Sequence, residues 1–174
     1  MGQSSSTSLP VVHTGTCSCG AVTIKTVTEP MLVINCHCTK CRAFTSEPFS
    51  GTTLFWKAAV HIEGYNSLQF EKTSVQFGLV GLKRGRCSKC HDPVIDIGRG
   101  MLGIFCCPSA NVLQVVPTAN MFYNSGLKEG KLGLKTYHSD FASNIFVYPI
   151  LLFKGLPQLW FLLMGSRAEG QGCN

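Results

Sequence analysis

The chain has 174 residues, of which 45% are hydrophobic and 14% are charged, and it contains 18 glycines and 10 cysteines. This length fits one domain with a tail, and the apolar content is sufficient for a core, which excludes a disordered chain. The formal net charge of +6 would favour a nucleic-acid partner, but that value counts every cysteine as a neutral thiol.

Residues 1–10 are polar and rich in serine, so we expect a flexible tail. Residues 1–8 show no basic region followed by an apolar one, so we predict no secretory signal, a cytoplasmic location and reduced cysteines. Gly2 and Ser6 also fit an N-myristoylation pattern, which would bring the chain to a membrane. A polar disordered tail has the same residues, so both interpretations stay open.

Short strands are predicted from Val11 onward, and no long stretch before residue 120 has helical periodicity. Residues 21–25 alternate with β-branched side chains, as a half-buried strand does, and Glu29-Pro30 forms a turn before a second strand. Two hairpins are also predicted, each from a pair of apolar runs around a glycine-containing turn: residues 60–62 with 68–70, and residues 94–97 with 102–105.

The most informative stretch is Cys36-His37-Cys38-Thr39-Lys40-Cys41, which has three cysteines in the spacing C-x-C-x-x-C. Residues i and i+2 of an extended chain point to the same face, and a turn after them brings the third thiolate round. Tetrahedral zinc with bonds near 2.3 Å needs its sulfur ligands roughly 3.8 Å apart. Three protein ligands with one open position are typical of a catalytic zinc.

Four further cysteines form a C-x-C pair, Cys17 and Cys19, and a C-x-x-C pair, Cys87 and Cys90. Together they supply the closed set of four thiolates that is typical of a structural zinc. Four thiolates on one zinc sum to −2 and three on another to −1, which lowers the formal charge of +6 to +3. We therefore predict two zinc ions and no nucleic-acid partner.

Several residues near these cysteines have two interpretations. The ring of His37 should point away from the metal, as a second-shell or surface residue. Arg42 could grip a substrate carboxylate or hydrogen-bond the carbonyls of the cysteine loop. Cys106 and Cys107 are either buried apolar residues or a source of a fourth ligand for the open position. The densest basic cluster, Lys83, Arg84 and Arg86, is interpreted as a solvated turn face.

Residues 145–164 are almost wholly apolar and long enough to span a membrane. Lys154 lies at the centre of this segment, and Pro149, Gly155 and Pro157 should break a helix, which argues against a span. The alternative is a pair of strands packed on the domain, or an aberrant C-terminus.

The cysteine pattern resembles the glutathione-dependent formaldehyde-activating enzyme family, which includes centromere protein V. The resemblance runs through residues 15–22, 36–42 and 86–90, with a weaker echo at 117–123. It implies a β-tent fold in which Cys17, Cys19, Cys87 and Cys90 hold a structural zinc, and Cys36, Cys38 and Cys41 hold a catalytic one. It also implies that glutathione is joined to formaldehyde as S-hydroxymethylglutathione. Asn120 stands where many relatives have histidine, and His91 stands where glycine is usual.

We therefore expect a mainly β, zinc-stabilised β-tent of small antiparallel sheets over residues 11–141, with an apolar extension of unknown role at 142–174. The favoured function is a zinc-dependent carbon–sulfur lyase or synthase acting on a glutathione adduct, with Arg42 as a glutathione contact. The alternative is a non-catalytic zinc-binding interaction module for a protein or chromatin partner. A third hypothesis, a membrane-associated scaffold, rests on Gly2 and the 145–164 segment.

Overall fold

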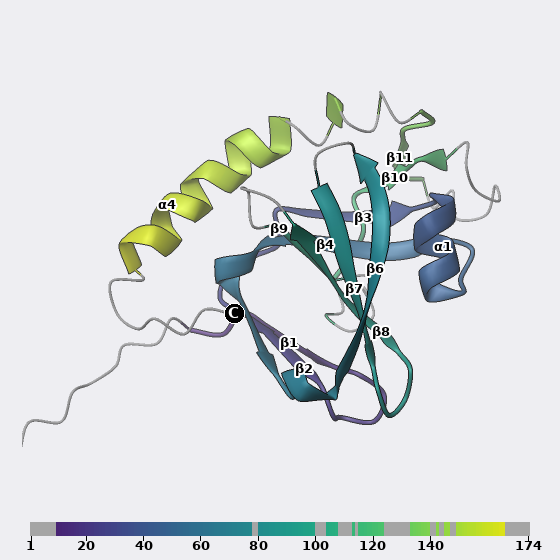
Figure 1. Ribbon diagram of the computed structural model, residues 1–174. Helices are drawn as coiled ribbons and strands as arrows, with labels where there is room; N and C mark the ends of the chain where they lie inside the picture. The colour runs from purple at the N-terminus through teal and green to yellow at the C-terminus, as the bar shows by residue number, and fades with distance from the viewer. Residues whose placement is uncertain are drawn as a thin grey trace, which may run out of the picture.

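Strands make up most of the regular structure, which confirms the mainly β prediction (Figure 1). In this computed structural model the chain is described over residues 10–77, 80–99, 104–107, 113, 115–123, 133–139, 142, 145–146 and 149–165. The strands are β1 (His13–Thr16), β2 (Thr23–Thr26), β3 (Leu32–Cys36), β4 (Ser50–Trp56), β5 (Val60–Glu63), β6 (Leu68–Phe77), β7 (Val80–Cys87), β8 (Pro93–Arg99), β9 (Ile104–Cys107), β10 (Ala119–Met121) and β11 (Lys135–Thr136). The helical elements are α1 (Thr39–Thr45), the 3-10 turns η1 (Lys57–Ala59) and η2 (Tyr65–Ser67), the π-helical turn η4 (Leu151–Gly155) and α4 (Leu156–Gly165).

The smaller sheet has three antiparallel strands in the order β1-β2-β5. Its central strand confirms the strand predicted at residues 21–25, although β2 begins and ends slightly later. Ile24 and Thr26 of β2 are buried, whereas Thr23 and Lys25 are half-buried. This alternation is what a strand with one face on the core requires.

The larger sheet has eight strands in the order β11-β10-β3-β4-β9-β8-β7-β6. Along the sheet from β3 through β4, β9, β8 and β7 to β6, neighbouring strands are antiparallel. In contrast, β10 pairs in parallel with both β3 and β11. The sequence did not indicate these two parallel pairs, because β10 follows β3 by more than eighty residues. Through them Asn120 of β10 lies beside Asn35, and Met121 lies beside Cys36.

One predicted hairpin is wrong and the other is confirmed. Residues 60–62 belong to β5, which pairs with β2, whereas residues 68–70 belong to β6, which pairs with β7 in the other sheet. Gly64 marks the crossing between the sheets, because it has a φ of +75° and a Cβ there would lie 2.0 Å from the Ala21 carbonyl oxygen. The second predicted pair does form, as the neighbouring antiparallel strands β8 and β9, in which Asp96 lies opposite Cys106 and Ile97 opposite Phe105.

Two groups of buried apolar residues fill the interior, and each contains cysteines. The first lies around the smaller sheet and the β7–β8 end of the larger one; it includes Cys17, Val22, Ile24, Phe55, Cys87, Val94 and Ile95. The second lies around β3, β4 and β10; it includes Met31, Ile34, Cys36, Cys38, Trp56, Met121 and Phe122. Cysteines of the two sets therefore pack in separate parts of the core, although Cys19 itself is exposed.

The C-terminal apolar segment is helical, so the predicted pair of strands is wrong. Trp56 Nε1 donates a hydrogen bond to the Gly155 carbonyl oxygen at 2.8 Å. A Cβ at Gly155 would lie 2.9 Å from Trp56 Cζ2, so glycine permits this close contact. Pro157 lies just after the π-helical turn η4, and the backbone stays helical without a break from η4 into α4. Gly155 and Pro157, which were expected to break a helix, therefore lie within a helical segment that packs on Trp56.

Among the residues that the structure describes, no helix combines the length and the hydropathy needed to cross a membrane. In Figure 1 the yellow helix α4 and the blue helix α1 lie on opposite sides of the view, with the strands between them. Gly2 and Cys173 lie outside the described residues.

Candidate metal centres

The first candidate centre is formed by Cys17, Cys19, Cys87 and Cys90, whose sulfur atoms all lie within 4.8 Å of one another. Cys19 Sγ lies 3.6 Å from both Cys17 Sγ and Cys87 Sγ. These separations are close to the roughly 3.8 Å between sulfurs that share a tetrahedral zinc. The geometry therefore brings together the four cysteines that the sequence groups, and it fits one metal ion.

Two similar turns place these sulfurs. Cys17 and Cys19 follow β1, and Cys87 ends β7 with Cys90 in the turn after it. In each turn the residue after the second cysteine has a left-handed backbone: Gly20 has a φ of 72° and His91 has a φ of 59°. Glycine adopts this conformation without steric cost, whereas histidine is strained there.

A carboxylate joins the two turns beside the sulfurs. Asp92 Oδ2 accepts hydrogen bonds from the backbone nitrogen of Ser18 at 2.7 Å and from Ser18 Oγ at 2.6 Å. These bonds lower the pKa of Asp92, so the carboxylate stays ionised. Ser18 lies between two of the cysteines, so the contact fixes one turn against the other.

The second candidate centre is formed by Cys36, Cys38 and Cys41, whose sulfurs also lie within 4.8 Å of one another. Cys36 ends β3, and Cys38 precedes α1 with an extended backbone, as the N-cap residue. The backbone nitrogen of Cys41 donates to Cys38 Sγ at 3.4 Å. The predicted turn that brings the third thiolate round is therefore the first turn of a short helix, which the sequence analysis missed.

The thiols of the second centre resist ionisation in the absence of a cation. The neighbouring Cys38 and Cys41 sulfurs, together with burial, raise the pKa of Cys36 well above its ordinary value. The Cys36 sulfur lowers the pKa of Cys41, but the Cys38 sulfur and burial outweigh this and raise it to about 12. Three sulfurs this close need a positive charge among them to exist as thiolates, and a divalent metal supplies one.

His37 lies between two of these cysteines and is fully buried, so the interpretation as a surface residue is wrong. Its Nε2 lies 3.5 Å from Asn120 Oδ1, and its ring lies 5.0 Å from that of Tyr123 and 5.3 Å from that of Phe49, between centroids. Burial lowers the pKa of His37, so the ring is neutral. His37 thus packs beside the centre and is not one of the grouped ligands.

Arg42 Nε donates to the carbonyl oxygen of His37 at 3.1 Å. This is the contact with the cysteine loop that was one of the two interpretations of Arg42. Cys106 and Cys107 lie in β9, where Cys106 pairs with Asp96 of β8 and Leu54 of β4, and Cys107 pairs with Thr53. Their side chains lie outside the described part of the structure, so both interpretations of these two cysteines stay open.

The basic cluster at 83–86 is not a solvated turn face, and this part of the sequence analysis is wrong. Arg84 lies within β7 and is 2% exposed. Its Nη1 donates to the Lys40 carbonyl oxygen at 2.5 Å, and its Nη2 lies 3.5 Å from Cys41 Sγ. Arg86 donates to the carbonyl oxygens of Phe44 and His91. Both guanidinium groups lie over the Phe44 ring, at 5.0 Å for Arg84 and 4.4 Å for Arg86.

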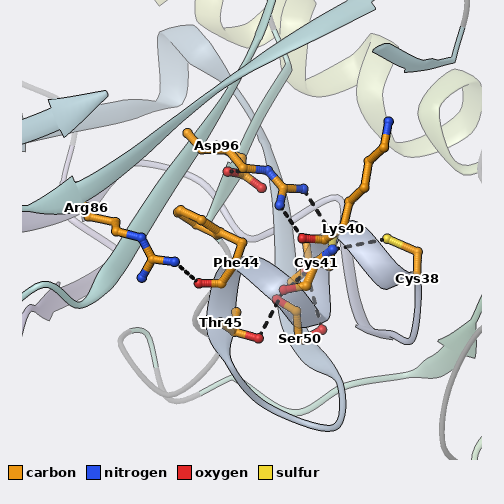
Figure 2. Close-up of polar contacts among 10 residues, drawn as sticks. Cys38, Lys40, Cys41, Phe44, Thr45, Ser50, Arg86 and Asp96 are labelled. Atoms are coloured by element: carbon orange, nitrogen blue, oxygen red, sulfur yellow. Dashed lines mark hydrogen bonds and ion pairs between the residues drawn. The ribbon is translucent and has the colours of Figure 1, made fainter. Parts of the chain in front are cut away.

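Two arginines of one strand therefore hold α1, the helix that carries Cys41. Figure 2 shows Arg86 on one side of Phe44, with Lys40 and Cys41 on the other side and Asp96 above them. The sequence indicates only that Arg84 and Arg86, which flank Gly85, share a face of a strand, and it does not indicate what that face contacts. A Cβ on Gly85 would lie 2.6 Å from Ile95 Cγ2, on the side away from the arginines.

The fold and these two centres define a mainly β protein with two cysteine sites suited to metal ions. The model of the family described as glutathione-dependent formaldehyde-activating enzyme matches residues 12–125, well over half of the chain. The chain belongs to this family, which confirms the resemblance seen in the sequence. No curated protein matches the chain. Among solved structures, the crystal structure of a Rhodobacter sphaeroides protein is similar, with a TM-score of 0.44 and 20% identity over 59% of this chain and 89% of that one.

Proposed function

We propose that both centres hold zinc, and that the second also binds the thiol of glutathione for its reversible addition to formaldehyde. One observation carries this proposal: three cysteine sulfurs are grouped without a fourth His, Cys, Asp or Glu ligand among the described residues. Zinc in proteins is almost always four-coordinate, so such a site has one position left for a substrate. The family name supports glutathione and formaldehyde as the reactants.

The two centres have different roles in this proposal. Cys17, Cys19, Cys87 and Cys90 form a closed thiolate set that holds a structural ion. Cys36, Cys38 and Cys41 form the open set, and a soft thiolate environment suits a fourth sulfur ligand. Zinc bound there would lower the pKa of an incoming thiol and so make it a nucleophile near neutral pH.

The proposed reaction is an addition that needs no oxidant or reductant. The glutathione sulfur attacks the carbonyl carbon of formaldehyde, and a carbon–sulfur bond forms while the second bond of the carbonyl breaks. The released electron pair stays on oxygen, which takes the proton lost by the thiol and gives S-hydroxymethylglutathione. The reverse step is the carbon–sulfur lyase reaction. The chain's part is to hold the thiol in place and to exclude water around Cys36 and Cys38, which are buried.

Cobalt substitution tests the proposal, because the cobalt spectrum reports the number of thiolate ligands. Added glutathione should raise the thiolate-to-metal absorption of the second centre, whereas S-methylglutathione, which has no free thiol, should not. Cys41→Ser should abolish the response, and Cys106→Ser and Cys107→Ser should preserve it. Addition of formaldehyde should then give the adduct, followed by NMR, faster than in the mixture without protein, and Cys41→Ser should abolish this acceleration.

One observation favours the alternative of a non-catalytic interaction module. The C-terminal helical segment exposes large apolar side chains: Phe153 is 81% exposed, Trp160 66% and Leu156 54%. Such a surface is typical of contacts with a partner. A cobalt spectrum with four thiolates at both ions, unchanged by glutathione, would support this alternative and contradict the enzyme.

A further inference from the structure

The side chain of Arg84 contacts the second centre from a distant strand. It lies on β7, more than forty residues from the cysteines in the sequence, and reaches across to the first turn of α1. Its two terminal nitrogens contact the Lys40 carbonyl oxygen and Cys41 Sγ. The sulfur contact is 3.5 Å long, which is a normal length for a donor nitrogen and a sulfur acceptor.

The other end of the guanidinium faces an acid. Arg84 and Asp96 are directly opposed on β7 and β8, and Arg84 Nε lies 3.5 Å from Asp96 Oδ1. Both side chains are buried, at 2% and 5% exposed. These two atoms are close enough for an ion pair but form no hydrogen bond with each other. Asp96 therefore orients the arginine, while the directional bonds of the guanidinium go to α1.

A lysine could not reproduce this arrangement. A guanidinium presents several donors in a planar fork, so it can bond two acceptors while its flat face lies over an aromatic ring. Arg84 does all of this at once, because its face lies over Phe44 while its fork meets Lys40 and Cys41. Its charge also offsets the negative charge of three thiolates on a divalent ion, in a site removed from water.

We propose that Arg84 is a positioning residue of the second metal centre, which holds Cys41 in place and reduces the electron density that its sulfur donates to the metal. This inference rests on the part of the proposed function that places a metal at Cys36, Cys38 and Cys41. It does not depend on which thiol takes the fourth position. A bond to a ligand sulfur withdraws charge from it, and outer partners of this kind commonly change metal affinity by about 10-fold to 100-fold.

Cadmium NMR of the full chain tests the inference, because each cadmium ion gives its own resonance and the four-cysteine centre is an internal reference. Arg84→Met should shift the resonance of the second centre, leave that of the first unchanged, and weaken second-centre affinity by at least about 10-fold. Arg84→Lys, which keeps the charge but not the fork, should restore only part of the affinity.

Arg86→Met is the matched control. Arg86 comes from the same face of β7 and lies over the same Phe44 ring, but its hydrogen bonds go to the carbonyls of Phe44 and His91. It should lower thermal stability without moving the resonance of the second centre. If Arg84→Met shifts the melting temperature as Arg86→Met does, but leaves the second resonance and affinity unchanged, Arg84 is only structural and the inference is wrong.

Arg84→Lys also decides the matter if Arg84→Met does not fold, since it keeps a buried positive charge opposite Asp96. A second-centre resonance and affinity equal to those of the unaltered protein would then overturn the inference. Failure of the proposed function looks different. Glutathione would leave the cobalt spectrum unchanged, while the effect of Arg84 on cadmium would persist.

Discussion

The two cysteine clusters are built from the same ligand atom but differ in what surrounds them. In the first, both pairs of cysteines sit in turns, and Cys19 is exposed to solvent. The charged group that joins these turns is the carboxylate of Asp92, which bonds to Ser18. In the second, Cys36 and Cys38 are buried, and a guanidinium lies against the sulfur of Cys41. The four-sulfur cluster is thus linked by a contact between its own two turns, whereas the three-sulfur cluster is contacted by a side chain from a distant strand.

The clusters also differ in what they connect. A metal ion in the first would join residues 17–19 to residues 87–90, and so would fix the smaller sheet to the end of β7 in the larger one. The second spans only six residues, from the end of β3 into α1. A cross-link over a long stretch of chain removes far more freedom from the unfolded state than a local one does. The fold should therefore depend on the first cluster and tolerate changes in the second.

The largest expected effect is a difference between Cys87→Ser and Cys38→Ser. Cys87→Ser should unfold the domain, because structural zinc contributes on the order of 10 kcal/mol, comparable to the whole stability of a small domain. Cys38→Ser should leave a folded protein that binds metal weakly at the second centre. Thermal melts with metal analysis check this, and damage in the reverse order would exchange the roles of the two clusters.

A smaller effect is expected from Asp92→Asn. The loss of charge weakens both hydrogen bonds from Ser18, so the free energy of unfolding should fall by about 1 kcal/mol, and the first centre should release metal faster to a chelator. Ser18→Ala removes only the hydroxyl bond and should have about half this effect. Neither change should alter the glutathione response of cobalt at the second centre; an altered response would mean that the clusters are not independent.

The smallest effect concerns the pH dependence contributed by Asp96. Burial raises the pKa of Asp96 to about 7, although Arg84 opposes this, so the folded state keeps a proton that the unfolded state loses above about pH 4. The stabilisation is therefore present at low pH and is lost as the pH rises through about 7. Asp96→Asn should remove roughly 1 kcal/mol of this pH dependence between about pH 6 and 8. Denaturant unfolding of both zinc-loaded proteins measures the difference, which should be absent if Asp96 is ionised throughout.

The two cysteine groups could be predicted from sequence because their chemistry is local. C-x-C and C-x-x-C spacings place sulfurs within reach of one ion in almost any turn, and only the pairing of the two distant groups needs the fold. Arg84 could not be found in the same way, since its contact with Cys41 depends on the register of β7 against β8 and on where α1 lies. When the strand register is unknown, the sequence of Lys83, Arg84 and Arg86 is typical of an ordinary charged surface.

The other errors have the same origin. The hairpin predicted around Gly64 has suitable local residues, but β5 and β6 find partners in different sheets. Likewise, Pro149, Gly155 and Pro157 disfavour a helix only when neighbouring structure is ignored. In the folded chain Gly155 packs on Trp56, and Pro157 lies within a continuous helical run, just after the π-helical turn. Strand pairing and helix docking depend on the whole folded chain, so they cannot be predicted from short segments alone.

Because Trp56 contacts Gly155, tryptophan fluorescence can report whether the C-terminal helical segment is docked on the domain. The protein has only two tryptophans. Trp56 is 4% exposed and hydrogen-bonded through its indole nitrogen, whereas Trp160 is 66% exposed. Their fluorescence should therefore separate into a component protected from a water-soluble quencher and a component open to it. Release of the C-terminal segment would expose Trp56 and leave the environment of Trp160 nearly unchanged, so the protected component alone reports whether that segment is docked.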